Sequence, residues 1–550
     1  IHINQIYYSL AMTSGKLEEQ VPLDPTSKII GDFGPWQLRI SILMSLLKLS
    51  MPWFQLDIVF LAPPQEFWCE KPISFAGYSD KEWRDISYPV IEEHPCLIFD
   101  PDILILAPYV DRQFIPLVPC PKFIYDNSIF NRTISSEWDL VCSRRWMLSQ
   151  IVLMWGVLLG GVIFGGMADR FGRKLTLMSA IFIQAVTSFL SSMMPWYWGF
   201  VANRFILALA SGGIGVISFV LCVEVVGGKY RTIIPVLYHV LFGFGNTVMA
   251  GLSYWLRDWR KLEFAMAGLS SLYLVYWFFV PESPRWLLAK GQDDKAIDDV
   301  LEIIKEAAKM NNRDITAENK LLLKMKKKDN STKVPGFLAF IRSRNMKIKT
   351  LLLSANWFCT GLAFYSFSQH LGSIASNIFL TVSLCGIIST PGALVCVCVI
   401  NKWGRKKTIA AFQLVTAICF LSIMVIPKDV FVNDWPRLFF AGLGFAGMAG
   451  TVPALYLYSG EIFPTLGRNI GVGGVSTFAR IGSMIAPGLV ALENVRDELP
   501  MIILTVMSLA QILLVVPLPE TTNCPLPDTL EEAENINRYL LILLFEYLVF

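Results

Sequence analysis

Long apolar stretches, separated mostly by short polar loops, dominate the chain. A transmembrane helix needs about 20 consecutive apolar residues to cross the bilayer core. We predict twelve such helices, at residues 38–62, 145–167, 175–195, 197–224, 232–254, 262–280, 349–370, 375–400, 408–427, 437–459, 470–492 and 499–518. The pattern therefore predicts an all-α polytopic membrane protein.

Two long hydrophilic segments interrupt this pattern, at 63–144 after the first span and at 283–347 after the sixth. They predict a first six-helix half over 38–282 and a second over 348–520, joined by a central loop at 283–347. An N-terminal segment (1–37) and a tail (521–550) flank the two halves. We interpret the first span as an uncleaved signal anchor, because no small-residue cleavage site follows it. Met12 is a candidate for the natural start, with residues 1–11 then an artefact. Residues 539–550 are too short to span the membrane and are either an interfacial helix or an artefact.

Basic loops predict the orientation. The short segments DRFGRK (169–174) and KWGRKK (402–407) are rich in Arg and Lys, which places them in the cytoplasm by the positive-inside rule. Both chain ends are then cytoplasmic, and 63–144 faces the outside of the plasma membrane. The loop RDWRK (257–261) disobeys the rule, because this topology puts its basic residues outside.

The predicted outer segment carries the marks of an oxidising compartment. It contains four cysteines: Cys69, Cys96, Cys120 and Cys142. An even number there predicts disulfides, with the connectivity left open. Asn131 begins an Asn-Arg-Thr sequon and is predicted to be glycosylated. A second sequon at Asn330 lies in the central loop and is expected to be unused.

Composition narrows the class of protein. Hydrophobic residues make up 54% of the chain and charged residues 17%, and the mean hydropathy is +0.50. These values exclude disorder, a coiled coil and most soluble enzymes. A net charge of +3 is too small to favour a nucleic-acid partner. The sequence contains no GxxxxGK[ST], HExxH or GxSxG motif, so we predict no enzymatic activity, cofactor or metal.

An internal repeat relates the two halves. Four features recur in order: Gly172 and Gly404, Arg204 and Arg437, Glu224 and Glu461, and the PES of 281–283 and the PET of 519–521. Their offsets are 232, 233, 237 and 238 residues. A nearly constant offset through four features predicts two parallel halves, with a substrate site at their interface near the membrane midplane.

The motifs resemble those of a known family. GGMADRFGRK (165–174) is similar to the signature of the major facilitator superfamily. EWDLVC (137–142), PESPRWLLAKG (281–291) and RNIGVG…ARIGSMIAP (468–487) resemble the organic cation, organic anion and carnitine transporters, solute carrier family 22. The resemblance covers about 31–535. It implies the major facilitator fold, with twelve helices in two halves that alternate access to a small organic ion.

The resemblance also implies a cytoplasmic latch that locks the two halves together by salt bridges and helix-end contacts. In the first copy it comprises Gly165, Asp169, Arg170, Gly172, Arg173, Glu224 and Arg231, and in the second Gly404, Arg405, Glu461 and Arg468. The alternative is that these charges only set the topology. Asn401 stands near the place of the aspartate in the second copy, so that copy is expected to latch more weakly.

Charged residues inside the membrane are costly and therefore mark functional sites. Lys48 and Asp57 lie nine residues apart on the first span, about 13 Å along a helix, too far to pair tightly. We consider Asp57 a substrate-binding residue, or a residue that merely snorkels to the outer surface. Arg480 in the eleventh span is the deepest charge. No buried acid is an evident proton carrier, which favours facilitated diffusion or exchange over proton symport.

The resemblance gives Arg480 a meaning, because cation carriers have an aspartate at its position and anion and carnitine carriers have an arginine. Ser389 stands where cation carriers have a glutamate, and Ala393 replaces the lysine of anion carriers. One remaining basic residue favours a monoanion or a zwitterion. Trp357, Phe364 and Tyr365 on the seventh span match the WF…Y pattern of the family, and we predict that they bind substrate.

Phe219 on the fourth span matches a further substrate position of the family. Such rings can stack on a flat substrate or hold a quaternary ammonium, and ordinary helix packing is the alternative. We therefore predict a carnitine-like or organic-anion carrier. An organic cation carrier that uses Asp57, and a non-transporting receptor or scaffold, remain alternatives. The basic segment 324–333 is a candidate contact for membrane lipid.

Overall fold

The computed structural model describes residues 29–535 apart from 64, 88–95, 105–114, 143–145, 229, 291–293, 314–336, 376, 429, 465–467, 497, 523–526 and 528–529. Four features discussed above lie outside these residues: the two terminal segments 1–11 and 539–550, the sequon at Asn330 and the basic segment 324–333.

Every predicted span falls on a helix. The first half contains α3 (Pro35–Gln55) with α4 (Ile58–Leu61), α8 (Trp146–Phe171), α9 (Arg173–Met193), α10 (Tyr197–Val225), α11 (Tyr230–Leu237) with α12 (Val240–Leu256), and α13 (Trp259–Ser271) continued by α14 (Tyr276–Phe279). The second half contains α19 (Arg344–Ile374), α20 (Ile378–Trp403), α21 (Arg405–Val425), α22 (Trp435–Ile462), α23 (Arg468–Val490) and α24 (Leu499–Val515). This arrangement confirms the all-α polytopic fold in two six-helix halves.

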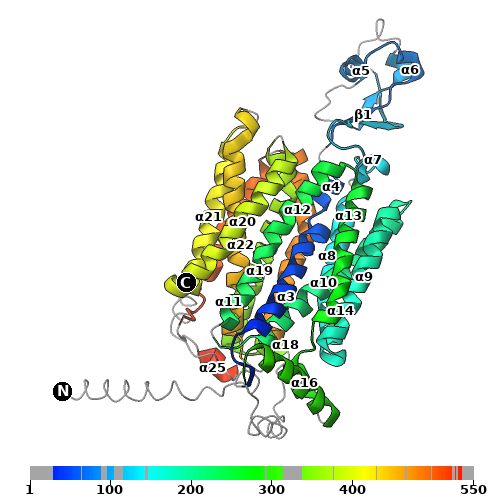
Figure 1. Ribbon diagram of the computed structural model, residues 1–550. Helices are drawn as coiled ribbons and strands as arrows, with labels where there is room; N and C mark the ends of the chain where they lie inside the picture. Colours follow the sequence, from blue (N-terminus) through cyan, green and yellow to red (C-terminus); the bar gives the residue numbers. More distant parts are fainter. Residues whose placement is uncertain are drawn as a thin grey trace, which may run out of the picture.

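The helices run side by side along one direction, and the two ends of the bundle differ (Figure 1). The segment between α4 and α8 projects from one end, which we call the disulfide end. At the opposite end lie α16 (Asp294–Met310), α18 (Phe337–Arg342) and α25 (Leu530–Asn535). The central segment, predicted only as a loop, therefore contains helices, including α15 (Pro284–Lys290).

Glycines allow neighbouring helices to approach closely in both halves. A Cβ atom at Gly160 of α8 would lie 2.0 Å from the carbonyl oxygen of Leu209 in α10, and one at Gly392 of α20 would lie 2.3 Å from that of Ala446 in α22. Small residues at such contacts are the usual basis of helix packing in membranes. Gly160 and Gly392 are separated by the same 232 residues as Gly172 and Gly404, so the repeat extends to the packing.

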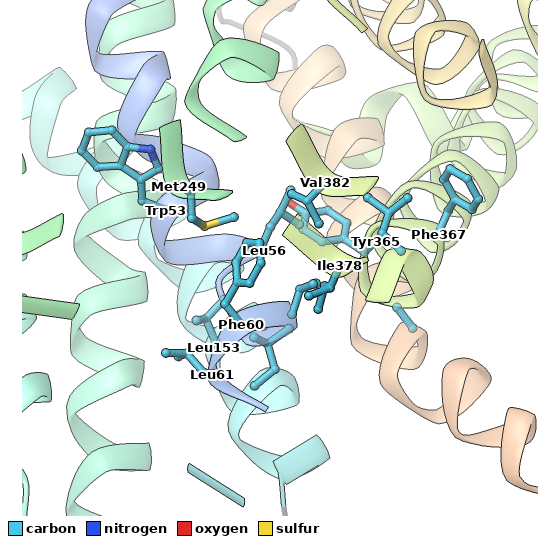
Figure 2. Packing of buried hydrophobic residues seen from close by; sticks show 14 of the residues in the cluster. Trp53, Leu56, Phe60, Leu61, Leu153, Met249, Tyr365, Phe367, Ile378 and Val382 are labelled. Carbon is cyan, nitrogen blue, oxygen red and sulfur yellow. The ribbon is translucent and has the colours of Figure 1, made fainter. Parts of the chain in front are cut away.

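An apolar cluster joins the two halves towards the disulfide end. Leu56 and Phe60 of the first half lie close to Ile378 and Val382 of α20 (Figure 2). The rings of Phe60 and Phe379 stack with their centroids 5.8 Å apart. Burial of these side chains closes the space between the halves at this end.

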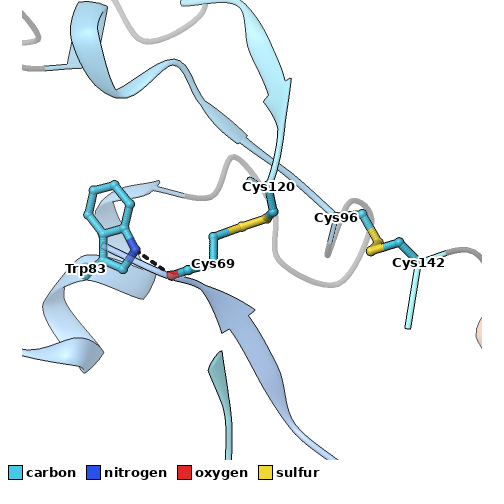
Figure 3. Close-up of a disulfide and its surroundings, with 5 residues drawn as sticks. All are labelled: Cys69, Trp83, Cys96, Cys120 and Cys142. Atoms are coloured by element: carbon cyan, nitrogen blue, oxygen red, sulfur yellow. Dashed lines mark hydrogen bonds between the residues drawn. A yellow bond between two sulfur atoms is a disulfide. The ribbon is translucent and has the colours of Figure 1, made fainter. Parts of the chain in front are cut away.

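The segment at the disulfide end is a small disulfide-linked unit. Strand β1 (Phe67–Cys69) pairs antiparallel with β4 (Phe123–Tyr125), and β2 (Leu97–Phe99) pairs antiparallel with β3 (Leu117–Pro119). Disulfides join Cys69 to Cys120 and Cys96 to Cys142, which uses all four predicted cysteines (Figure 3). The buried indole of Trp83 in α5 (Asp80–Ser87) donates a hydrogen bond to the carbonyl of Cys69 at 3.0 Å.

Candidate functional site

A cavity that is partly open to solvent lies between the two halves; it and the adjoining solvent comprise about 880 Å³ not filled by protein atoms. Helix α3, the α11–α12 segment, α19, α20, α22 and α23 contribute its walls. Its polar and aromatic lining comprises Lys48, Gln55, His239, Phe242, Trp357, Thr360, Phe364, Tyr365, Ser389, Phe445, Tyr456, Ser476 and Arg480. Among the described residues that line it there is no aspartate or glutamate.

Arg480 is held in the cavity wall by a hydrogen-bonded chain that crosses between the halves. Its guanidinium donates to the Tyr365 hydroxyl at 3.0 Å, and this hydroxyl donates to the side-chain oxygen of Gln55 at 2.8 Å. Arg480 and Tyr365 belong to the second half and Gln55 to the first. Gln55 of the first half therefore helps to orient Arg480 of the second half through the Tyr365 hydroxyl.

Lys48 of α3 supplies a second cation to the same cavity. Its Nζ lies 5.3 Å from the ring centroid of Tyr238 and 5.8 Å from that of Phe242, within the range of cation–π attraction. The prediction of a single basic residue in the site is thus wrong. The sequence did show Lys48 as a charge at membrane depth. Helical spacing alone could not show that Lys48 faces the cavity and that Asp57 does not.

The predicted aromatic residues separate into two layers. Trp357, Phe364 and Tyr365 line the cavity, as does Ser389. Phe219 is not among the lining residues, and its ring packs behind the wall with its centroid 5.6 Å from that of Tyr456. A direct substrate contact at Phe219 therefore does not fit this arrangement.

Asp57 points away from the cavity, at the break between α3 and α4. Arg204 of α10 donates to both of its carboxylate oxygens, at 3.0 and 2.7 Å. Asp57 is 1% exposed and Arg204 1% exposed. This placement gives no support to a substrate role for Asp57, because its carboxylate is bound by a buried guanidinium.

The first latch centres on Arg173 at the start of α9. Its guanidinium lies 2.9 Å from Glu224 and 3.0 Å from Asp169. Glu282 accepts hydrogen bonds from the backbone N–H groups of Arg173 and Lys174 at 2.8 and 3.1 Å. A carboxylate at a helix N-terminus satisfies the first N–H groups and the positive end of the helix dipole.

The second latch repeats this geometry. Arg405 lies 2.8 Å from Glu461, and Glu520 accepts from the backbone N–H groups of Arg405 and Lys406 at 2.9 and 3.2 Å. Partial burial acts to raise the pKa of Glu520, but hydrogen bonds from Thr522 and from the start of α21 outweigh it and lower the pKa. Glu520 therefore stays charged at neutral pH.

Left-handed glycines make both helix starts possible. Gly172 has φ +108° and Gly404 has φ +91°, a region that other residues rarely adopt. Glu282 and Glu520, which cap these helices, were not predicted as latch residues. The repeat of PES in PET contained the signal, but the sequence alone could not show where the two carboxylates point.

The latch differs from the prediction in one respect, because each of its described ion pairs joins two residues of the same half. The exposed guanidinium of Arg170 lies 5.5 Å from the ring centroid of Phe171. Gly165 lies in α8, Arg468 begins α23, and Arg231 lies in α11 with its side chain outside the described part.

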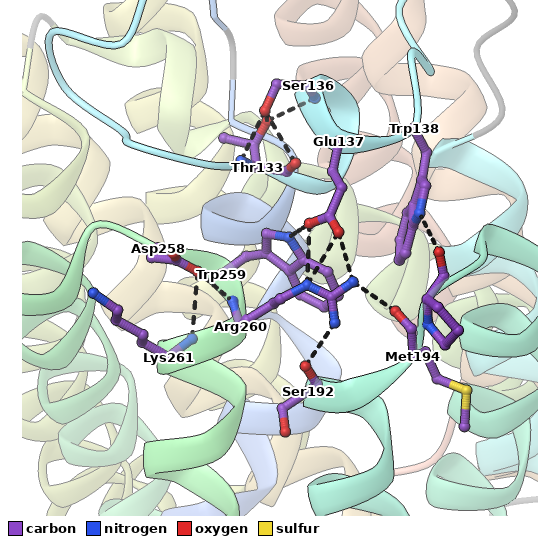
Figure 4. Close-up of polar contacts among 11 residues, drawn as sticks. Thr133, Ser136, Glu137, Trp138, Ser192, Met194, Asp258, Trp259, Arg260 and Lys261 are labelled. Atoms are coloured by element: carbon purple, nitrogen blue, oxygen red, sulfur yellow. Dashed lines mark hydrogen bonds and ion pairs between the residues drawn. The ribbon is translucent and has the colours of Figure 1, made fainter.

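A second polar cluster fastens the disulfide end (Figure 4). Arg260 of α13 binds the Glu137 carboxylate at 2.6 Å and donates to the carbonyls of Ser192 and Met194, at 2.7 and 2.6 Å. Trp259 donates its indole N–H to Glu137 at 2.7 Å. We call Glu137, Trp259 and Arg260 the clasp. Within this loop, which does not follow the positive-inside rule in the predicted topology, the charge of Arg260 is matched by that of Glu137.

Comparison with known proteins identifies the family. The Major Facilitator Superfamily model matches residues 146–487 and 348–533. An organic cation transporter protein of Drosophila melanogaster is 32% identical over 524 residues, which cover 92% of this chain and 94% of the relative. Human solute carrier family 22 member 2 is 31% identical, with 92% of this chain and 94% of that protein covered. The chain belongs to solute carrier family 22 of the major facilitator superfamily.

Solved structures agree on the fold. The inward-open xylose transporter XylE from E. coli matches this transporter with a TM-score of 0.61 at 15% identity, covering 90% of this chain and 99% of that one. XylE bound to 6-bromo-6-deoxy-D-glucose matches with a TM-score of 0.58 at 16% identity, covering 91% and 98%. These structures show the fold, and membership of the family makes the protein a secondary transporter of the major facilitator type and not an enzyme.

Proposed function

We propose that this transporter carries small organic anions or zwitterions by alternating access, and that the cavity between the halves binds them. The observation that carries the proposal is the charge of the lining: Lys48 and Arg480 contribute two cations, and the described lining contains no acid. A bound carboxylate would compensate charges that are otherwise costly at membrane depth.

Arg480 is suited to bind the carboxylate of the substrate. A guanidinium donates two parallel hydrogen bonds to a carboxylate, and such charge-assisted pairs are stronger than neutral hydrogen bonds. The aromatic faces of Trp357 and Tyr456, whose centroids are 4.6 Å apart, provide an apolar wall. This wall fits a flat organic anion, or the quaternary ammonium group of a carnitine-like zwitterion.

The two latches and the apolar cluster support alternating access. The cluster closes the disulfide end, while the described latch ion pairs hold segments within each half together and leave the halves free to move against each other. Rocking of one half against the other around a fixed site is the usual mechanism of this architecture.

The topology we propose places the disulfide end outside the plasma membrane. Residues 1–37, 283–347 and 521–550 are then cytoplasmic, and membrane lipid is expected to contact the basic segment 324–333. Disulfides at Cys69–Cys120 and Cys96–Cys142 support an oxidising compartment at this end. Asn131 is exposed there, as a glycosylated residue must be.

Organic cation transport is the second candidate. The names of the relatives in Drosophila favour it, and the aromatic walls could hold a cation. The carboxylate that this alternative requires at Asp57 is bound by Arg204 instead. We therefore rank transport of organic cations below transport of organic anions or zwitterions.

Uptake of a charge panel tests the proposal. The probes are radiolabelled p-toluenesulfonate, L-carnitine and tetraethylammonium, which are an anion, a zwitterion and a cation. Purified transporter in liposomes, at equal pH on both sides, should take up one of the first two saturably and exclude the third. Saturable uptake of tetraethylammonium alone would contradict the proposal and favour the cation carrier.

A further inference from the structure

A buried charge cluster lies in the first half, beside the cavity and not part of it. It consists of Asp57 at the break between α3 and α4, Arg204 of α10 and Glu263 of α13. Asp57 forms two hydrogen bonds with Arg204, whereas the nearest Glu263 oxygen lies 3.6 Å from the Arg204 guanidinium. The Asp57 and Glu263 carboxyl groups also lie near enough to each other to interact electrostatically.

The cluster holds one acid too many. Two carboxyl groups face one guanidinium, and all three side chains are at most 2% exposed. In the described structure, Oε2 of Glu263 and Nε of Arg204 are buried without a hydrogen-bond partner. A buried carboxylate without its own counter-charge is unfavourable, and two adjacent carboxyl groups commonly share a proton.

Among the residues that the structure describes, no second cation forms an ion pair with the cluster. Arg204 interacts electrostatically with Tyr197 in addition to the two acids, and the ring centroid of Phe200 lies 5.4 Å from its guanidinium. The buried residues that α3 and α12 contribute are apolar or neutral, and so are those of α9 apart from Arg173 at its far end.

Two further cations lie on neighbouring helices, and both face elsewhere. Arg260, three residues before Glu263, is bound by Glu137 and by backbone carbonyls. Lys48 of α3 faces the cavity and the rings of Tyr238 and Phe242. Neither Arg260 nor Lys48 therefore neutralises the second acid of the cluster.

The cluster sits at a position that links it to the transport cycle. Gln55, two residues before Asp57, lines the cavity and accepts from Tyr365 in the chain to Arg480. Phe60, three residues after Asp57, stacks on Phe379 of the second half and helps to close the disulfide end. One short segment of the first span, residues 55–60, thus contributes to the substrate site, to the charge cluster and to the apolar contact that closes the disulfide end.

We propose that Glu263, together with Asp57, binds one proton that is carried inward with the substrate. The proposal rests on the proposed transport function and adds proton symport to it. When the disulfide end opens, external water reaches the cluster and supplies the proton to Glu263. The neutral acid then allows the cluster to be buried and this end to close. Release on the other side returns Glu263 to its carboxylate form.

Coupled flux in liposomes tests the proposal. The vesicles contain the pH-sensitive dye pyranine, and valinomycin with equal potassium clamps the membrane potential. The substrate is whichever of the three panel probes the transporter takes up at equal pH. An acidic exterior should drive its accumulation, up to about tenfold per pH unit for one proton. Addition of substrate should also acidify the lumen.

Glu263→Gln mimics the protonated acid permanently. This variant should exchange internal for external probe at near wild-type rate, but the acidic exterior should no longer drive accumulation and the dye signal should be lost. Asp57→Asn should lose the dye signal too, because Glu263 then pairs one-to-one with Arg204. Glu493→Gln is the matched control: Glu493 pairs one-to-one with His370 at 3.3 Å, and its loss should leave proton coupling intact.

Two outcomes would overturn the proposal: transport by the wild type without any response to the pH gradient, or an undiminished response in Glu263→Gln. The wild-type measurement decides the matter even if the variants fail to fold. The charge class of the substrate is read at equal pH, so failure of the anion proposal remains distinguishable from failure of proton coupling.

Discussion

Lys48 and Arg480 lie in opposite halves of the transporter and face the same cavity. Each half therefore contributes one cation to the proposed substrate site. An anion bound between them would attract both halves, which couples occupancy of the site to their relative position. Lys48 approaches the rings of Tyr238 and Phe242, whereas Arg480 is fixed by Tyr365.

Replacement of Lys48 by Met should weaken anion binding while preserving the shape of the side chain. Because Lys48 is a point charge and Arg480 a bidentate donor, we expect KM for the transported anion to rise about 3–30-fold with little change in the amount at the cell surface. Lys261→Met, which removes an exposed lysine outside the cavity, is the control. Equal KM values in both variants would show that Lys48 does not contact substrate.

Glu282→Gln and Glu520→Gln should each impair the latch of their own half. Removing the charge from a helix N-terminus costs about 0.5–1 kcal/mol, so the proteins should fold. We expect a lower maximal uptake rate with an unchanged KM, since neither residue lines the cavity. The lowered pKa of Glu520 predicts that its stabilisation persists through neutral pH and is lost only as the pH falls through that lowered value. Normalised uptake kinetics would check both variants, and a change confined to KM would refute the assignment.

Loss of the clasp should destabilise the disulfide end. Glu137→Gln leaves the half-buried Arg260 without its carboxylate, which should cost about 1–3 kcal/mol. Thermal unfolding of purified Glu137→Gln, Arg260→Gln and the double variant forms a mutant cycle. The double variant should be less destabilised than the sum of the single ones. Strict additivity would mean that the two side chains do not interact.

Glycosylation distinguishes the two sequons. Asn131→Gln should abolish the glycosidase-sensitive shift in electrophoretic mobility, because Asn131 is exposed at the disulfide end, and Asn330→Gln should leave it unchanged. A shift that depends on Asn330 would reverse the proposed topology.

The sequence predicted the spans and halves well because membrane-spanning helices must satisfy their backbone internally and show a long apolar signal. Arg480 and its aromatic neighbours also followed from the sequence, because depth and family resemblance agreed. The pairing of Asp57 with Arg204 could not be predicted, because Arg204 lies 147 positions away and no local pattern shows it. Lys48 was underestimated for the same reason, since the direction of a side chain on a kinked first span depends on tertiary packing.

The most direct test of the anion or zwitterion site is uptake divided by surface-biotinylated transporter for Arg480→Ala, Arg480→Lys and the wild type. Loss of a charge-assisted pair is worth about 1.5–3 kcal/mol, so Arg480→Ala should lower kcat/KM for the transported anion or zwitterion about 10–100-fold. Arg480→Lys should retain transport with a raised KM, because it keeps the charge and loses the planar fork. Equal normalised uptake by Arg480→Ala and the wild type would contradict the account and place the cation carrier first.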